Sequence, residues 1–280
     1  MLVKLAEKVV SGRLPALLIA AAIGFMPMLS WGSAVVVALV ALRKGSTEAI
    51  WPFIGASIPA GVAWFMGDMS AVGILFCSLV GALVLANTTQ LGLALSGIAF
   101  TAVLMTGVVS LFPEQTALLY EQYSLMLEQL QSEGFEKIDI ETQQFVTYSI
   151  VWSSAWLGTL SLLLARWLQA KLYNPGGFQK EFHYLRLSPL LVGVLVAGMA
   201  ASQAIPMLEG TLPVLVMPIM MAGFGLIHCI VWIKRMGNMP LVMLYASLVF
   251  MGPIAVLLLM VAAITDSFSN YRNKMIPPEQ

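Results

Sequence analysis

The chain has 280 residues, of which 59% are hydrophobic and only 10% carry charge, and its formal net charge at pH 7 is zero. A soluble domain carries about 25% charged residues, so this chain lacks the polar side chains that would cover a water-soluble globule of its size. The composition therefore predicts an integral membrane protein, and the balanced charge gives no reason to expect nucleic-acid binding.

The N-terminal region resembles the start of a secretory signal, because Lys4, Lys8 and Arg13 precede an apolar run. No small-x-small cleavage site follows that run, and apolar sequence resumes directly after Trp31. We therefore expect an uncleaved first helix.

The apolar runs predict an all-α, polytopic transmembrane bundle of eight or nine spans, forming one membrane domain over residues 1–280. Two details stay open. The first two runs could form one span kinked at Pro27, and Pro253 could break the last run into a hairpin. The runs lie at 14–28, 31–42, 49–66, 69–86, 90–111, 146–168, 189–206, 211–233 and 240–264.

Basic residues decide between these readings, because Lys and Arg collect on the cytoplasmic side of membrane proteins. If the N-terminus is cytoplasmic and 14–42 forms a hairpin, 11 of the 14 basic residues face the cytoplasm, whereas one span over 14–42 leaves only 6 there. The hairpin is favoured, and it puts the C-terminus outside unless Pro253 starts a second hairpin. The 11 residues are Lys4, Lys8, Arg13, Arg43, Lys44, Arg166, Lys171, Lys180, Arg186, Lys234 and Arg235.

An acidic insertion at 113–145 lies on the predicted extracytoplasmic side. It holds seven acidic residues against one lysine. Apolar residues recur in it at helical spacing, which predicts an amphipathic helix on the outer membrane face. A solvated linker helix and a lid over an outward pocket are both compatible with this pattern. The residues at this spacing are Leu119, Tyr123, Met126 and Leu130.

A basic, aromatic segment at 171–188 interrupts the apolar runs on the predicted cytoplasmic side. Asn174-Pro175-Gly176-Gly177 must end the preceding helix. The following stretch alternates aromatic and cationic faces, which predicts a short interfacial helix with cations toward water. We expect five residues to form this cytoplasmic interface: Arg166, Lys171, Lys180, His183 and Arg186.

The run RWLQAKLYNPGGF at 166–178, followed by FHYLRLSP at 182–189, resembles the YybS-like family of uncharacterised bacterial inner-membrane proteins. His228 before a basic turn, and an ending that contains Asp266 and Arg272, are similar to the family as well. The resemblance covers most of the chain and is specific in these three places, and the acidic insertion departs from it. It implies a bacterial inner-membrane location.

The family is distantly similar to the substrate-binding S-components of energy-coupling-factor vitamin transporters. That relation implies a compact bundle with an outward pocket for a small molecule and a partner membrane subunit. S-components dock on their partner through an Ala-x-x-x-Ala pattern, which Ala16 with Ala20 and Ala34 with Ala38 both match. Such small residues also pack a protein's own helices closely, so both readings stay open.

Ionisable residues within membrane spans are candidates for function, and His228 is the one titratable side chain deep in an apolar run. A proline-rich stretch at 206–218 predicts an irregular outer helix end that could form one pocket wall. Capping, interfacial solvation and core packing are the alternatives for these residues. The candidate ligand pocket comprises Asp68, Gln203, Glu209, Met217, Met221 and His228.

The ending contains Asp266 and Arg272, which are six residues apart. That spacing is too long for an i,i+4 pair on one helix face. We expect each of them either to bind another segment or to end the helix. The two cysteines, Cys77 and Cys229, lie in apolar runs and are expected to be buried free thiols.

The chain has no Walker A, Gly-x-Ser-x-Gly or HExxH motif, so we expect no enzyme activity, no cofactor and no metal. The first hypothesis is a non-enzymatic membrane scaffold or assembly factor, whose basic segment holds a cytoplasmic partner or anionic lipid. The second is an S-component-like subunit that binds a small molecule. A third, a lipid-active enzyme, would use His228 or His183 as a base.

Overall fold

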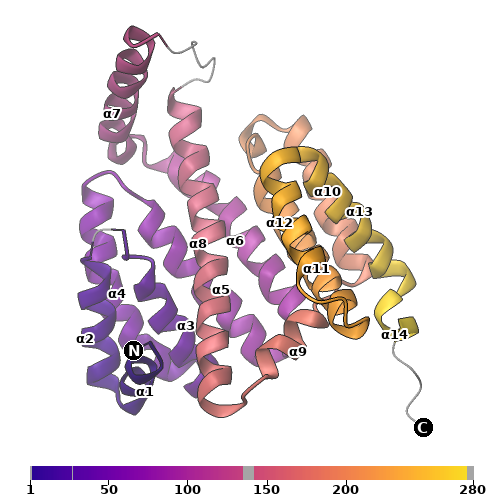
Figure 1. Cartoon of the computed structure of the whole chain (residues 1–280). Coiled ribbons are helices and arrows are strands. Elements are labelled where there is room, and N and C mark those ends of the chain that lie inside the picture. The colour runs from indigo at the N-terminus through magenta and orange to yellow at the C-terminus, as the bar shows by residue number, and fades with distance from the viewer. Residues whose placement is uncertain (1, 27, 135–141, 276–280) are drawn as a thin grey trace.

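The computed structural model describes residues 2–26, 28–134 and 142–275, and every regular element within them is a helix. The all-α prediction is therefore confirmed for this part of the chain. In Figure 1, α1 to α8 form one group of packed helices, and α10 to α14 pack on its side, with α9 between them. The helices are α1 (Leu2–Ser11), α2 (Arg13–Gly24), α3 (Gly32–Lys44), α4 (Ser46–Phe65), α5 (Ser70–Thr88), α6 (Leu91–Leu111), α7 (Pro113–Ser132), α8 (Thr142–Tyr173), α9 (Gly177–His183), α10 (Pro189–Ala204), η1 (Pro206–Leu208), α11 (Leu212–Ile233), α12 (Met239–Met251), α13 (Pro253–Ser269) and α14 (Tyr271–Met275).

Four helices are long and apolar enough to cross a bilayer: α5, α6, α8 and α11. Four more, α2, α10, α12 and α13, are apolar but shorter than the roughly 20 residues that a full crossing needs. The prediction of a membrane-embedded helical protein fits this set of helices.

The core is built around α3, whose residues Ser33 to Ala41 are all buried. Helices α2, α4, α5 and α8 surround it. On α2, the small side chains allow a close crossing with α4. A Cβ atom on Gly55 of α4 would overlap the carbonyl oxygen of Leu17. Such contacts need small residues on the facing helices.

The four alanines expected as docking residues take part in this packing. Ala16, Ala20, Ala34 and Ala38 are at most 1% exposed within the chain itself. They are therefore not available to a partner subunit, and the expectation of docking through them is corrected. These four alanines instead pack between the chain's own helices, which is the alternative that the sequence left open.

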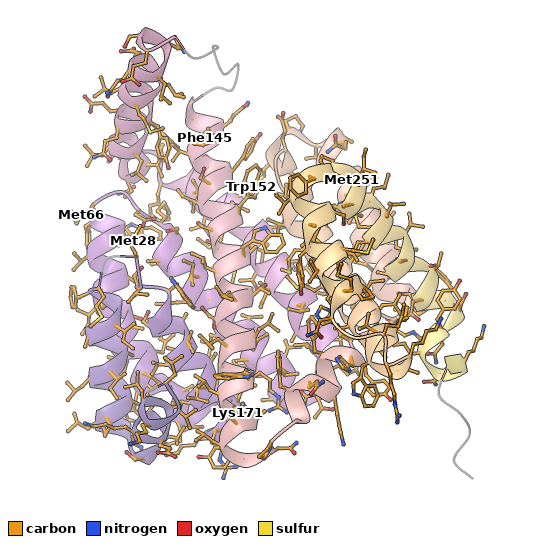
Figure 2. All side chains as sticks on the ribbon, viewed as in Figure 1. Met28, Met66, Phe145, Trp152, Lys171 and Met251 are labelled. Atoms are coloured by element: carbon orange, nitrogen blue, oxygen red, sulfur yellow. The ribbon has the colours of Figure 1, made fainter. Side chains whose placement is uncertain are left out.

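The last predicted span is two helices. Gly252, with a φ of +41°, and Pro253 end α12 and begin α13, and the two helices pack against each other. Figure 2 shows Met251 at the end of the molecule opposite to Lys171. Helix α14 consequently lies at the same end as α1 and α9 (Figure 1). The last described helix thus lies at the same end as α1, as the alternative of a hairpin at Pro253 expects, and not at the opposite end.

Helix α7 occupies most of the acidic insertion and projects beyond the other helices at the top of Figure 1. Leu119 and Tyr123 pack on a small cluster that includes Met69 and Val109, whereas Met126 is exposed. Its glutamates Glu114, Glu121, Glu128 and Glu133 are exposed. Residues 135–141 of the insertion lie outside the described residues.

Candidate functional site at the basic end

The lower end of the molecule in Figure 1 gathers almost all of the basic residues. Because the α12–α13 hairpin returns to this end, Arg272 and Lys274 join the 11 residues that the sequence placed together. Of the 14 basic residues, only Lys137 is not among them, and it lies outside the described residues. Ten of the others are exposed: Lys4, Lys8, Arg13, Arg43, Lys44, Lys171, Lys180, Lys234, Arg235 and Lys274.

Helix α9 is the centre of this end and is fixed to its neighbours. The Arg166 guanidinium of α8 donates to both carboxylate oxygens of Glu181, with 2.8 Å from Nε to Oε2. On the other side, a Cβ atom on Gly225 of α11 would lie 2.5 Å from the Phe182 carbonyl oxygen. The absence of a side chain at Gly225 thus lets α9 lie directly against α11.

The contact between Arg166 and Glu181 gives a first prediction. Glu181→Gln removes a charge-assisted, bidentate interaction that is partly shielded from water. We expect amide hydrogen exchange over 178–185 to become roughly tenfold faster. The matched control is Glu48→Gln, because Glu48 pairs with an exposed arginine, Arg13, and exposed pairs contribute little. Unchanged exchange in Glu181→Gln would show that α9 is held by packing alone.

Two adjoining cavities open beside α9, with volumes of about 710 Å³ and about 410 Å³. Gln179, His183 and His228 line both of them. The larger one also contacts Tyr184, Trp232, Arg235 and Asn238, and the smaller one Trp167, Lys171 and Phe178. Aromatic rings beside cations are typical of surfaces at the level of lipid headgroups.

His228 is hydrogen-bonded at both ring nitrogens. Its Nδ1 lies 2.9 Å from the Phe224 carbonyl oxygen, and its Nε2 lies 3.3 Å from the Tyr245 hydroxyl. A carbonyl can only accept, so this pattern assigns a proton to Nδ1. The two contacts hold the His228 ring in one orientation.

His183 is buried on α9, with its ring 5.6 Å from that of Trp232. Burial lowers the pKa of His183, and the nearby His228 and Arg272 lower it further. The folded protein consequently favours the neutral imidazole at this position.

The lowered pKa of His183 predicts a loss of stability on acidification. An unfolded histidine titrates near 6.5, so below about that pH the unfolded chain binds a proton that the folded chain resists. The free energy of unfolding then falls as pH drops below about 6.5, and this contribution is complete above it. We expect the melting temperature of His183→Gln to fall less between pH 7.5 and 5.5 than that of the unsubstituted protein. Identical pH profiles would contradict the assignment to His183.

Asp266 and Arg272 pair with each other, contrary to the expectation from their spacing. Helix α13 ends at Ser269, and Asn270, with a φ of +47°, reverses the chain. Arg272 Nε then lies 3.2 Å from Asp266 Oδ2, and the Tyr271 N–H donates to Asp266 Oδ1 at 2.9 Å. The i,i+4 argument assumed a continuous helix, which the left-handed turn at Asn270 removes.

The six candidate pocket residues are not gathered in one place. Asp68 caps α5 by accepting a hydrogen bond from the Ser70 N–H at 2.8 Å, as the capping alternative expects. Met217 is fully buried and accepts a hydrogen bond from Thr159 at 3.4 Å. Gln203 and Glu209 are exposed near the upper end, and Met221 is part of the core. Of the six, only His228 lines the two cavities beside α9.

The proline-rich stretch is irregular, as predicted. It contains the short helix η1 and a turn at Gly210 with a φ of +77°, before α11 begins at Leu212. The Gly210 carbonyl oxygen accepts a hydrogen bond from the Trp152 indole at 2.6 Å. This contact ties the upper end of α11 to α8. Both cysteines are buried and unbridged.

The described residues include no group of three or more His, Cys, Asp or Glu side chains that could hold a metal ion. Comparison of the chain with protein-family models, with curated proteins and with solved structures found no match. The resemblance to the YybS-like family therefore stays a prediction, and the site must be interpreted from its own geometry.

Proposed function

We propose that this protein is a non-enzymatic scaffold or assembly factor of the bacterial inner membrane, which holds an acidic partner protein at its basic end. The observation that carries the proposal is the gathering of ten exposed Lys and Arg side chains at one end, around the firmly packed helix α9. Cations that are held on a fixed surface select an acidic partner and speed its association.

In this proposal the basic end and the N-terminus face the cytoplasm, as the positive-inside rule favours. The chain passes through the membrane region ten times, through α2 to α6, α8 and α10 to α13. The hairpin of α12 and α13 adds one pass to the nine expected. Helix α7 then lies on the extracytoplasmic side.

Several observations support a scaffold over the other two hypotheses. Residues Ser33 to Ala41 of α3 are all buried, and the candidate residues for an outward pocket are not gathered. Both nitrogens of His228 are engaged by neighbours, so neither is free to act as a base. The S-component-like function stays a prediction.

Site-specific photocrosslinking tests the proposal. Crosslinkers placed next to Lys171 and Lys180 in native membranes are expected to capture one defined acidic protein. Capture should be lost in the double reversal Lys171→Glu, Lys180→Glu. It should persist in the matched reversal Lys4→Glu, Lys8→Glu on α1, which changes the charge equally. Failure to capture a partner, or equal loss in both variants, would reject the docking surface.

A further inference from the structure

One buried arginine, Arg272, and one half-buried arginine, Arg186, converge on the end of α13. Arg186 donates from Nη2 to the Ser267 carbonyl oxygen at 3.0 Å. Arg272 donates from Nη2 to the Ala222 carbonyl oxygen at 3.1 Å and pairs with Asp266. Arg272 is 2% exposed, and Asp266 and Ser267 are each 1% exposed. The two guanidiniums thus share one protected region between α11, α13 and the segment after α9.

The charges of this cluster do not balance. Among the described residues, two guanidiniums stand against the one carboxylate of Asp266. No second carboxylate among the described residues forms an ion pair with Arg186 or Arg272. Burying an ionised group without a counter-charge is strongly unfavourable, so the excess positive charge calls for an anion.

The cluster also has unused hydrogen-bond donors. Arg186 Nε, Arg272 Nε and Arg272 Nη1 are buried, and none of them has an acceptor among the described residues. The Arg272 Nε is at ion-pair distance from Asp266 but is not aligned with it as a hydrogen bond. Buried polar groups in native proteins almost always have a partner. Three such donors on two converging side chains therefore indicate a missing acceptor with more than one oxygen.

We propose that Arg186 and Arg272 bind one phosphate group with a single negative charge, either the phosphodiester of a phospholipid headgroup or inorganic phosphate. One such group balances the excess charge, and its several oxygens match donors that come from two directions. Arginine is the side chain best suited to such oxyanions. The cluster lies at the basic end, at the level of lipid headgroups in the proposed orientation.

The cavities beside α9 lie on the same side of the molecule as the cluster. His183 lines both cavities, and Arg272 of the cluster is among the charges that lower its pKa. The phosphate site does not depend on the proposed protein partner, so either proposal can fail alone.

The key variant is Arg186→Gln. It removes one unused donor and the excess charge, and it leaves Asp266 and Arg272 balanced, so the protein should still fold. Arg186→Lys is the second variant, because it keeps the charge but withdraws the Nε donor. The matched control is Arg43→Gln, which removes an exposed arginine at the same end, where Arg43 lies 3.9 Å from the centre of the Tyr173 ring.

Two probes distinguish the sources of phosphate. Native mass spectrometry of protein from phosphatidylglycerol nanodiscs reports a retained phospholipid. Thermal unfolding in phospholipid-free detergent, titrated with inorganic phosphate against chloride at equal ionic strength, reports the free anion. We expect one of the two signals in the unsubstituted protein and in Arg43→Gln. In Arg186→Gln and Arg186→Lys, the same ligand should bind at least about tenfold more weakly than it binds the unsubstituted protein.

A retained phospholipid without a phosphate shift assigns the site to a headgroup, and the reverse assigns it to a soluble phosphate. Three results would overturn the proposal: neither signal in the unsubstituted protein, equal signals in Arg186→Gln and Arg43→Gln, or a chloride shift as large as that of phosphate.

Discussion

Replacing Asp266 with leucine is expected to lower the free energy of unfolding by about 3–5 kcal/mol. The substitution removes the one carboxylate that forms an ion pair in the cluster of Arg186 and Arg272, as far as the described residues show. The buried Arg272 guanidinium then loses the carboxylate with which it pairs. Denaturant unfolding in detergent micelles, followed by tryptophan fluorescence, measures the loss.

The double substitution Asp266→Leu, Arg272→Met separates charge from packing. It returns the net charge of the cluster to its value in the unsubstituted protein. Both new side chains are apolar and similar in volume to the side chains that they replace. We expect it to recover most of the lost stability, to within about 1 kcal/mol of the unsubstituted protein. A double variant as unstable as Asp266→Leu would mean that shape, and not charge, governs this region.

Gly55→Ala is expected to cost about 2–3 kcal/mol. Its new methyl group would overlap the backbone carbonyl oxygen of Leu17, and a backbone atom cannot rotate away as a side chain can. Helix α2 would have to move away from α4. The buried side chains of Ala16 and Ala20 would then lose contacts with their neighbours. The change in melting temperature of the purified protein measures this effect.

Gly61→Ala on the same helix is the control for Gly55→Ala. A Cβ atom at Gly61 would meet nothing within 4 Å. Because alanine favours the helix over glycine, this variant should be unchanged or more stable by up to about 1 kcal/mol. Equal destabilisation of the two variants would show that α4 does not depend on its close crossing with α2.

Composition and hydropathy were sufficient to predict the helical architecture, because both act over whole segments. The break at Pro253 was also visible in the sequence, but only as an alternative. The pairing of Asp266 with Arg272 was not predictable, since it depends on Asn270 adopting a left-handed conformation. A one-residue turn of this kind changes which side chains meet without changing any periodicity.

The candidate site likewise combines features that the sequence predicts with features that only the folded structure shows. The turn residues 174–177 located the start of α9 in the sequence, because turn residues are local signals. The position of Met217 in the core depends on Thr159, which is 58 residues away in the sequence. The contributions of Gln179 and Trp232 to the cavities likewise depend on how α9 packs against α11. The advance signal of the buried cluster was the ending that contains Asp266 and Arg272, just after the last apolar run.

The orientation of the basic end can be measured with single cysteines in a background where Cys77 and Cys229 are replaced by serine. Lys8→Cys, Lys180→Cys and Lys274→Cys should react with an impermeant maleimide only from the cytoplasmic side of membrane vesicles. Glu128→Cys on α7 should react only from the opposite side. Labelling of Lys180→Cys and Lys274→Cys from opposite sides would contradict a single basic end that faces the cytoplasm.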